Sequence, residues 1–394
     1  MTAGGIEPTG MSNAVSGGTP TQIQSITLHG EVVEESYMTR VFVCALMLFT
    51  LGSCGYDKGS TVKSTKKTTS SNSPVLRHPI QSAAFFDLTN AWIVTGDRDL
   101  LLTHDGGVTW EKTAARSVNG FECVSFIDGE QGWTTNDLGV VWSTQDGGRT
   151  WRTISSIGHG GGFSIDQIKF EDEHNGWMLE PFSVWRTTDG GSSWTQKEYD
   201  TLLASACFVN RVAWVFDQDN RLFLFTPDGG DTSQVRYIPG KDGDGDLRGI
   251  YCLNENAGWI TRGSGSPEFG NNRLYRTQDG GETWLTKEIP GSRTIIDAVY
   301  FRDDNEGWVA GSEKIPGPDR ADGFTGLILH TRDGGQTWEE QRTGVQDLGY
   351  NTIYFSDARH GWLSGYDKVY RTDDGGKSWT VALSVQRLAE TQRM

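Results

Sequence analysis

The sequence predicts an all-β protein, a seven-bladed β-propeller built from four-stranded antiparallel blades. Three observations predict this fold. A phrase built around Asp-Gly-Gly recurs seven times, from His104–Trp110 to Asp373–Trp379, at intervals of 39 to 54 residues. A Gly-Trp or Ala-Trp pair precedes each phrase. Short runs of alternating apolar and polar residues, typical of strands, lie between these landmarks. The interval is about the length of one propeller blade.

Each repeat is expected to form one blade. The inner strand ends in a phrase such as Phe126–Asp128, and the second strand starts at Gly-Trp. The third strand runs into the Asp-Gly-Gly box, and the fourth starts at the box tryptophan. We expect the repeated tryptophans to pack the blades together rather than to bind a ligand. They are Trp92, Trp110, Trp133, Trp151, Trp177, Trp194, Trp214, Trp259, Trp284, Trp308, Trp338, Trp362 and Trp379.

The box is the predicted hairpin between strands three and four, and its composition suits a tight turn. An aspartate side chain can accept hydrogen bonds from backbone N–H groups a few residues on, and Gly-Gly allows positive φ angles. The box aspartates are therefore expected to be structural: Asp105, Asp146, Asp189, Asp228, Asp279, Asp333 and Asp374. The fourth box has Ser233 where the others have tryptophan, so blade four is expected to be the least well clamped.

The phrase Thr-x-Asp-Gly-Gly-x-Thr-Trp resembles the Asp-box, or BNR, repeat of sialidases, some glycosidases, sortilin-like receptors and photosystem II assembly factors. The complete unit, with Phe-x-Asp and Gly-Trp ahead of the box, is similar to that of the photosystem II assembly and stability factors over residues 80–385. This resemblance implies a non-catalytic scaffold without cofactors that binds a protein or membrane-protein complex. It does not imply a photosynthetic partner, because similar domains occur in bacteria without photosynthesis.

The alternative is a sialidase-like glycoside hydrolase or a glycan-binding propeller. The Arg77–Pro79 segment is similar to the Arg-Ile-Pro motif of sialidases, with Arg248, Arg293 and Tyr370 available for a carboxylate clamp and a nucleophile. Sialidases have six blades and fewer boxes, however, and Tyr370 recurs as Tyr275, as structural residues do. A hydrolase also needs two carboxylates at a set separation. We therefore favour a scaffold without catalytic residues.

The chain ahead of the repeats has the pattern of a bacterial lipoprotein. Residues 38–53 hold a positively charged start, a short apolar run and small residues before Cys54, which is typical of a lipoprotein-type signal peptide. Cys54 is the predicted lipid attachment site, and the protein is expected at the bacterial cell envelope, lipid-anchored and extracytoplasmic. An uncleaved membrane anchor is the alternative, but the apolar run is short for a span.

The remaining boundaries follow from composition. Residues 1–37 lack periodicity and are expected to be a non-native or disordered leader, with Met38 as the true start. Residues 54–75, rich in Ser, Thr and Lys, are expected to be a flexible tether. The propeller is predicted over residues 76–385 and a C-terminal tail over 386–394.

Net charge and cysteine spacing limit the kinds of ligand that the protein is expected to bind. The chain has a formal net charge of −16, which repels phosphate backbones and argues against nucleic acid. Outside the leader region, Cys123, Cys207 and Cys252 lie on predicted inner strands of different blades and lack metal-ligand spacing. They are expected to be small buried hydrophobic residues.

The departures from the repeat are predicted to fall on one face of the propeller. Blade five inserts residues 262–273 and blade six inserts residues 312–326, both between strands two and three. Long loops on one face of a rigid scaffold commonly bind partners. The predicted partner-binding residues are Arg262, Glu268, Phe269, Asn271, Ile315, Arg320 and Phe324. The alternative is that these loops merely cover the channel.

Two further features are interpreted as structural rather than functional. Asp242, Asp244 and Asp246 alternate as in a calcium loop, but Leu247 stands where such loops need glycine, so they are weak candidates. Arginines recur three residues before three boxes and are expected to pair with acids on adjacent strands. They are Arg186, Arg276 and Arg371.

Overall fold

The computed structural model describes residues 79–113, 120–158, 165–217, 223–240, 245–263, 272–291, 294–315, 323–344 and 349–384. These residues form seven four-stranded sheets in which each strand pairs antiparallel with the next along the chain. The prediction of a seven-bladed propeller with four-stranded blades is confirmed. Within the described part, no helix is long and apolar enough to cross a membrane.

The blades follow one another in chain order. Blade 1 consists of β1 (Ile80–Phe85), β2 (Ala91–Thr95), β3 (Leu100–Thr103) and β4 (Glu111–Lys112). Blade 2 has β5 (Cys123–Phe126), β6 (Gly132–Thr135), β7 (Val140–Thr144) and β8 (Arg152–Ser156). Blade 3 has β9 (Gln167–Phe170), β10 (Gly176–Glu180), β11 (Ser183–Thr187) and β12 (Thr195–Glu198). Blade 4 has β13 (Leu203–Val209), β14 (Val212–Asp217), β15 (Phe223–Thr226) and β16 (Gln234–Arg236).

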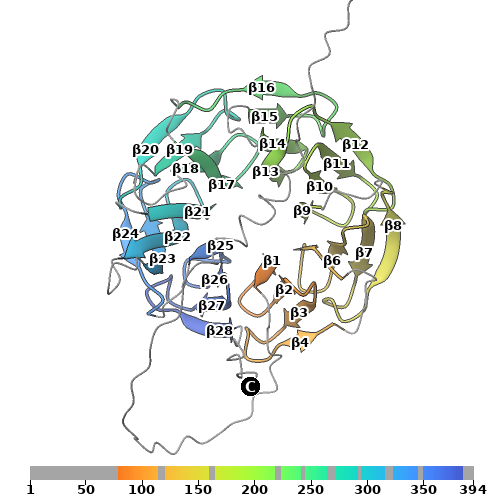
Figure 1. The fold of residues 1–394 in the computed structure, drawn as a ribbon, viewed down its shortest axis with the longest axis horizontal. Helices are drawn as coiled ribbons and strands as arrows, with labels where there is room; N and C mark the ends of the chain where they lie inside the picture. Colours follow the sequence, from red (N-terminus) through yellow and green to blue (C-terminus); the bar gives the residue numbers. More distant parts are fainter. Residues whose placement is uncertain are drawn as a thin grey trace, which may run out of the picture. The chain divides into compact units, whose positions relative to one another are not determined.

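Blades 5 to 7 complete the ring, and blade 6 contains the longest strands. Blade 5 consists of β17 (Asp246–Cys252), β18 (Gly258–Gly263), β19 (Arg273–Thr277) and β20 (Leu285–Glu288). Blade 6 has β21 (Thr294–Phe301), β22 (Gly307–Ile315), β23 (Gly323–Thr331) and β24 (Glu339–Gln341). Blade 7 has β25 (Tyr350–Phe355), β26 (Gly361–Gly365), β27 (Lys368–Thr372) and β28 (Thr380–Ser384). In Figure 1 the first strand of each blade lies toward the centre of the ring and the fourth at its rim.

The motif tryptophans join neighbouring blades. The Gly-Trp indole of one blade stacks on the phenylalanine that ends the inner strand of the next blade. Ring centroids are 3.5 Å apart for Trp92 and Phe126, 3.8 Å for Trp133 and Phe170, and 3.7 Å for Trp308 and Phe355. Such pairs contribute about 0.5–1.5 kcal/mol each beyond the area that they bury.

The glycine of the Gly-Trp pair makes room for this stack. A Cβ atom on Gly132 would meet the ring of Phe126, which lies between that glycine and Trp92. Gly176, Gly307 and Gly361 have the same relation to the phenylalanine of their own inner strand. The Phe-x-Asp and Gly-Trp phrases therefore recur together because their side chains form one layered contact between blades.

The ring closes by direct contact between blades 7 and 1. The indole N–H of Trp362 donates to the carbonyl oxygen of Asp87 at 2.7 Å, and that of Trp110 donates to Ala382 at 3.0 Å. The backbone N–H of Ile80 donates to Tyr366 at 3.1 Å. Blades 1 and 7 each consist of four consecutive strands, β1 to β4 and β25 to β28. The ring therefore closes without a strand exchanged between the first and the last blade.

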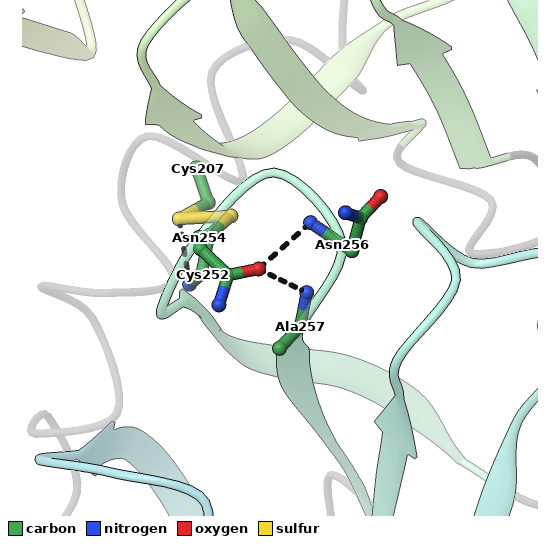
Figure 2. The surroundings of a disulfide bond; sticks show 5 residues. All are labelled: Cys207, Cys252, Asn254, Asn256 and Ala257. Atoms are coloured by element: carbon green, nitrogen blue, oxygen red, sulfur yellow. Dashed lines mark hydrogen bonds between the residues drawn. A yellow bond between two sulfur atoms is a disulfide. The ribbon is translucent and has the colours of Figure 1, made fainter.

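The junction between blades 4 and 5 departs from this pattern. Cys252 stands at the position of the stacking phenylalanine and forms a disulfide with Cys207 of β13, with Cα atoms 6.0 Å apart (Figure 2). Figure 2 also shows the following turn, in which Asn254 accepts hydrogen bonds from the backbone of Asn256 and Ala257. The expectation that these cysteines are merely small hydrophobic residues is therefore wrong for Cys207 and Cys252.

Cys123 fits the expectation better. It is buried and unbridged, and its thiol donates to the carbonyl oxygen of Ile165 at 2.9 Å. At the junction of blades 4 and 5, the indole of Trp214 packs edge-on against Phe223 and Trp284 in place of the missing phenylalanine. The disulfide thus lies at the junction where a cysteine replaces the stacking phenylalanine.

Candidate functional site

The box hairpins, together with the turns between strands one and two, occupy one face of the propeller, which we call the box face. In blade 2, Asp146 accepts hydrogen bonds from the backbone N–H and the hydroxyl of Thr150, at 2.9 and 2.5 Å. The hydroxyl of Thr144 donates to Asp146 at 2.8 Å and accepts from Gly148 at 3.0 Å. Equivalent bonds recur in the other boxes, so the carboxylates are engaged within their own hairpins.

The opposite face carries the connections between strands two and three and between blades; we call it the insertion face. The longest hairpin of this face belongs to blade 6, where β22 and β23 pair as far as Ile315 and Gly323. The prediction of a loop over residues 312–326 is therefore wrong at both ends, because those residues extend the ladder. The stretch 316–322 lies outside the described residues.

The predicted partner-binding residues are only partly described. Phe324 pairs with Lys314, and both Phe324 and Ile315 are half-buried rather than exposed as expected. Arg262, on β18 of blade 5, donates from Nε to the carbonyl oxygen of Gly245 at 2.9 Å, so it also holds its own blade. Glu268, Phe269, Asn271 and Arg320 lie outside the described residues.

An ion-pair cluster supports the base of the blade 6 hairpin. Arg342, which follows β24, donates from Nη2 to Glu313 of β22 at 2.9 Å and from Nε to Glu340. Its hydrogen bonds to these two carboxylates raise the pKa of Arg342. The hairpin is thus anchored to the outer strand of its own blade.

An irregular pairing begins the inner strand of each blade: a register shift in five blades and an extra backbone hydrogen bond in blades 2 and 3. In five blades the register of the first strand shifts by one residue, as at Ile296/Ala298. In blade 2, the backbone N–H of Glu122 donates to the carbonyl oxygen of Thr135, which is the pairing partner of the next residue, Cys123. In blade 3, the N–H of Asp166 likewise donates to Leu179, the partner of Gln167. Bulges re-aim a side chain. The extra residues, which we call the bulge ring, are Gln81, Glu122, Asp166, Ala204, Arg248, Asp297 and Asn351.

The bulge ring surrounds a polar cavity of about 490 Å³ in the central channel. Five of its members line this cavity, and small residues such as Ser82, Gly249 and Ala298 beside them leave it open. Because the bulges come at the start of the inner strands, the cavity lies toward the insertion face. The lining members of the ring are Gln81, Asp166, Arg248, Asp297 and Asn351.

Charges in the ring are partly balanced across blades. Arg248 Nη1 lies 3.4 Å from Asp297 Oδ1 of the next blade, and both side chains are about one-third exposed, at 29% and 35%. Burial raises the pKa of Asp297, and Arg248 opposes this rise. The guanidinium Nε of Arg248 is buried without a hydrogen-bond partner. The cavity therefore presents both donors and acceptors to an entering polar segment.

Glu122 is the buried member of the ring. Its carboxylate lies 3.4 Å from Arg98 and accepts a hydrogen bond from the backbone N–H of Ile165 at 3.2 Å. Arg98 in turn pairs with Asp137 at 2.6 Å. Burial raises the pKa of Glu122 to about 7 against the lowering effect of Arg98. These contacts connect blades 1, 2 and 3 beside the cavity.

The residues considered for a hydrolase do not form one site in the described residues. Arg248 lines the channel, whereas Tyr370 is fully buried in the core of blade 7, edge-on to Tyr350 at 5.8 Å. Arg77 and Arg293 lie outside the described residues. A buried tyrosine on a third strand cannot reach a substrate in the channel, so this proposed nucleophile is wrong.

The described residues also contain no group of three or more His, Cys, Asp or Glu side chains that could hold a metal ion. Asp246, of the weak calcium candidates, starts β17 and lies 4.0 Å from Arg248, whereas Asp242 and Asp244 are outside the described part. Cys54, the expected lipid site, is also outside it.

The recurring arginines pair differently from the expectation of acids on adjacent strands. Arg276 pairs with Asp304 in the first turn of the next blade at 2.7 Å, and Arg371 pairs with Asp373 of its own box hairpin at 2.9 Å. Arg186 and Arg276 lie over the indole of the Gly-Trp motif in their own blade, at 5.3 and 5.5 Å from the ring centroid. Their guanidinium groups therefore lie against the tryptophan layer.

Comparisons with known proteins agree with the resemblance inferred from the repeats. Residues 66–159 match the family model described as photosynthesis system II assembly factor YCF48. The chain is 24% identical over 313 residues to the chloroplastic photosystem II stability/assembly factor HCF136 of Arabidopsis thaliana, covering 70% of each protein. It is 24% identical over 289 residues to the photosystem II assembly lipoprotein Ycf48 of Synechococcus sp. (strain CC9902), covering 61% of this chain and 81% of that protein.

A solved structure shares the fold. YCF48 bound to D1 peptide superposes with a TM-score of 0.60 at 21% identity, covering 77% of this chain and 95% of that one. The chain is thus an Asp-box propeller that resembles the photosystem II assembly and stability factors.

Proposed function

We propose that this protein is a non-catalytic assembly scaffold that binds an extended segment of a membrane-protein partner at its insertion face. The observation that carries this proposal is the polar cavity at the bulge ring, with donors and acceptors from five blades around one opening. A backbone segment needs both kinds of group, because its N–H and C=O groups alternate. The long hairpin of blade 6 belongs to the same face.

The relatives support a peptide or protein as the ligand. A solved YCF48 propeller of the same fold carries a D1 peptide. The proteins that match this chain along most of its length are assembly factors. The layered tryptophan contacts make the ring rigid, and a rigid scaffold binds a segment without first paying an ordering cost.

We further propose that the protein works at an extracytoplasmic membrane surface, attached through a lipid on Cys54. The matching Ycf48 of Synechococcus is a lipoprotein, and the residues before Cys54 have the pattern of a lipoprotein signal. The disulfide between Cys207 and Cys252 supports an oxidising compartment, because disulfides rarely persist in the cytosol.

Site-specific photo-crosslinking tests the binding face. The full chain, expressed in its native host, would carry p-benzoylphenylalanine at Phe324 on the insertion face or at Val108, which is 71% exposed in the first box. We expect a membrane-protein adduct from position 324 and none from position 108. Adducts from position 108 alone, or equal adducts from both, would contradict the assignment of the face.

A deletion provides the functional test. Replacing residues 316–322 by a two-residue turn would keep the paired part of β22 and β23 and remove only the hairpin tip. Replacing residues 264–271 in the same way would test blade 5. We expect partner capture to be lost in the double variant while the thermal unfolding midpoint stays near that of the parent. Full capture by a folded double variant would overturn the proposal.

A further inference from the structure

The fourth box leaves a tryptophan site empty. In blades 2, 3 and 5 the box indole donates its N–H to the second glycine of its own box: Trp151 to Gly148, Trp194 to Gly191 and Trp284 to Gly281, at 2.9 to 3.1 Å. In blades 2 and 3 the same ring also packs edge-on against the inner-strand phenylalanine. Blade 4 has Ser233 at this position, so the site lacks its side chain.

Neighbouring groups replace the polar contacts of the missing indole but not its volume. Lys197 of β12 donates from Nζ to the carbonyl oxygen of Gly230 at 3.1 Å, which is the acceptor that a box tryptophan would use. The hydroxyl of Tyr199 lies 3.1 Å from that of Ser233. An aromatic ring buries 150–250 Å². A Cβ atom on Gly230 would meet only Trp177, at 3.9 Å, whereas one on Gly191 would meet the box indole of Trp194 at 3.5 Å, so space remains beside Gly230.

A cavity of about 260 Å³ remains between blades 3 and 4 at this place. It reaches down to Trp177 and Val184, and its walls include Tyr199 and Gly230. The equivalent groove between blades 2 and 3, where Trp194 is present, measures about 190 Å³. The cavity beside blade 4, whose box lacks tryptophan, is thus the larger of the two.

An unpaired cation borders the cavity. Arg186 lies over Trp177, and its buried Nε has no hydrogen-bond partner. The equivalent Arg276 pairs with Asp304 in the first turn of the following blade. The first turn of blade 4, Asn210-Arg211, supplies no acid. Arg211 repels the charge of Arg186, and Asp231 and Glu171 attract that charge without forming a direct ion pair with it among the described residues.

We propose that this vacant tryptophan site is a docking slot for an aromatic side chain of a protein partner, preferably tryptophan, with an adjacent carboxylate of the partner pairing with Arg186. The other repeats define the chemistry, since their boxes carry an indole at this site and Arg276, the equivalent of Arg186 in blade 5, pairs with an acid of the following blade. The slot opens on the box face, opposite the insertion face, and is independent of the proposed function. It would give the scaffold a second point of contact.

Calorimetric titration of the full chain tests the slot. The probes are an acetylated, amidated peptide with adjacent Trp and Asp, the same peptide with Ala for Trp, the same peptide with Asn for Asp, and indole-3-propionate. We expect one-to-one binding of the Trp-Asp peptide and at least about tenfold weaker binding of the Ala peptide, a difference of about 1.4 kcal/mol. Absence of saturable binding of the Trp-Asp peptide would overturn the proposal.

Variants identify the place of binding. Ser233→Trp refills the slot and should abolish binding while raising the unfolding temperature, whereas Ser233→Ala leaves the slot open and should bind normally. Arg186→Gln should weaken the Trp-Asp peptide but not its Asn counterpart, and this comparison stands even if Ser233→Trp fails to fold. Equal binding of the Trp-Asp peptide to the parent, Ser233→Trp and Arg186→Gln would overturn the proposal. Binding of indole-3-propionate without any peptide would show that the slot serves a free aromatic acid and not a protein.

Discussion

The indole N–H of Trp362 donates to the carbonyl oxygen of Asp87 at 2.7 Å, and this bond joins residues 275 positions apart in the chain. The Trp362 ring also stacks on Phe85, with centroids 5.5 Å apart. The contact therefore connects the last blade to the first. It makes one large ring out of seven sheets that are each built locally.

Removing the indole of Trp362 should weaken the contact between blades 7 and 1 and destabilise the fold. Trp362 is fully buried, so Trp362→Ala is expected to lower the free energy of unfolding by about 3–5 kcal/mol. Urea denaturation followed by far-ultraviolet circular dichroism measures the loss. Val108→Ala, at an exposed box position, is the matched control and should change stability by less than about 0.5 kcal/mol. Similar losses in both variants would argue against a special role for the closure.

Loss of the interblade disulfide should also cost stability. Cys207 and Cys252 are separated by 45 residues in sequence, and cross-links of this kind typically contribute about 2–4 kcal/mol. We expect dithiothreitol to lower the unfolding temperature of the parent and to leave the Cys207→Ala/Cys252→Ala variant unchanged. Non-reducing mass spectrometry verifies the bridge first. A parent protein with the bridge intact that is insensitive to reductant would contradict the clamp between blades 4 and 5.

The box carboxylates should make stability fall in acid. Hydrogen bonds from the hydroxyl and backbone N–H of Thr337 hold the pKa of Asp333 at about 2, below its usual 3.8. The folded state therefore binds fewer protons than the unfolded state between these pH values, and this stabilisation is present above about pH 4 and is lost toward pH 2. Asp333→Asn should give a shallower dependence of unfolding free energy on pH in this window. An unchanged pH dependence of the unfolding free energy would show that Asp333 does not titrate as described.

Glu122 should make the stability of the fold decrease as the pH rises through neutrality. Burial raises its pKa to about 7 from 4.5, so the folded state binds more protons than the unfolded state between these values. Its contribution is present below about pH 4.5 and is lost as pH rises through 7. Glu122→Gln should reduce the drop in stability between pH 5 and pH 8, measured by urea denaturation. Glu171, whose pKa burial also raises to about 7, should leave part of the drop in place.

A pH dependence identical in the parent and in Glu122→Gln would contradict this assignment. Glu171→Gln serves as the matched variant, because it removes a carboxyl group that titrates in the same range outside the bulge ring. The double variant should show the smallest drop. Additive effects are expected, since the two carboxylates lie on different blades.

Much of the fold could be predicted from the sequence because each repeated phrase reflects a steric or backbone requirement at its own position in the blade. The Gly-Trp pair marks the place where an aromatic ring leaves no room for a Cβ atom, as at Gly132. The box marks a turn with two glycines at positive φ, as at Gly147 and Gly148. Both signals depend on residues close in sequence and recur along the chain, with Ala91 and Ala213 in place of the glycine in blades 1 and 4. Blade number and strand order follow from counting them.

The site was less predictable because its geometry depends on register and on contacts between blades. The seven positions of the bulge ring hold six different residue types, so the ring has no signature of its own, although each position follows a buried apolar residue such as Phe121 or Ile165. The strand ends at Ile315 and Gly323 look like loop residues in sequence, and only their pairing makes them part of the sheet. Cys252 could have been noticed as a substitution for phenylalanine in the repeat.

The sequence by itself determined the period, the turns and the aromatic layers, because hydrophobic alternation and turn chemistry act over a few residues. Only the tertiary structure decided which side chains meet across blades: Arg248 with Asp297, Cys207 with Cys252, and Lys197 with Gly230. Curving seven sheets into a ring brings equivalent positions of neighbouring blades side by side. Whether such a pair attracts, cross-links or leaves a cavity therefore depends on the two residues that the ring brings together.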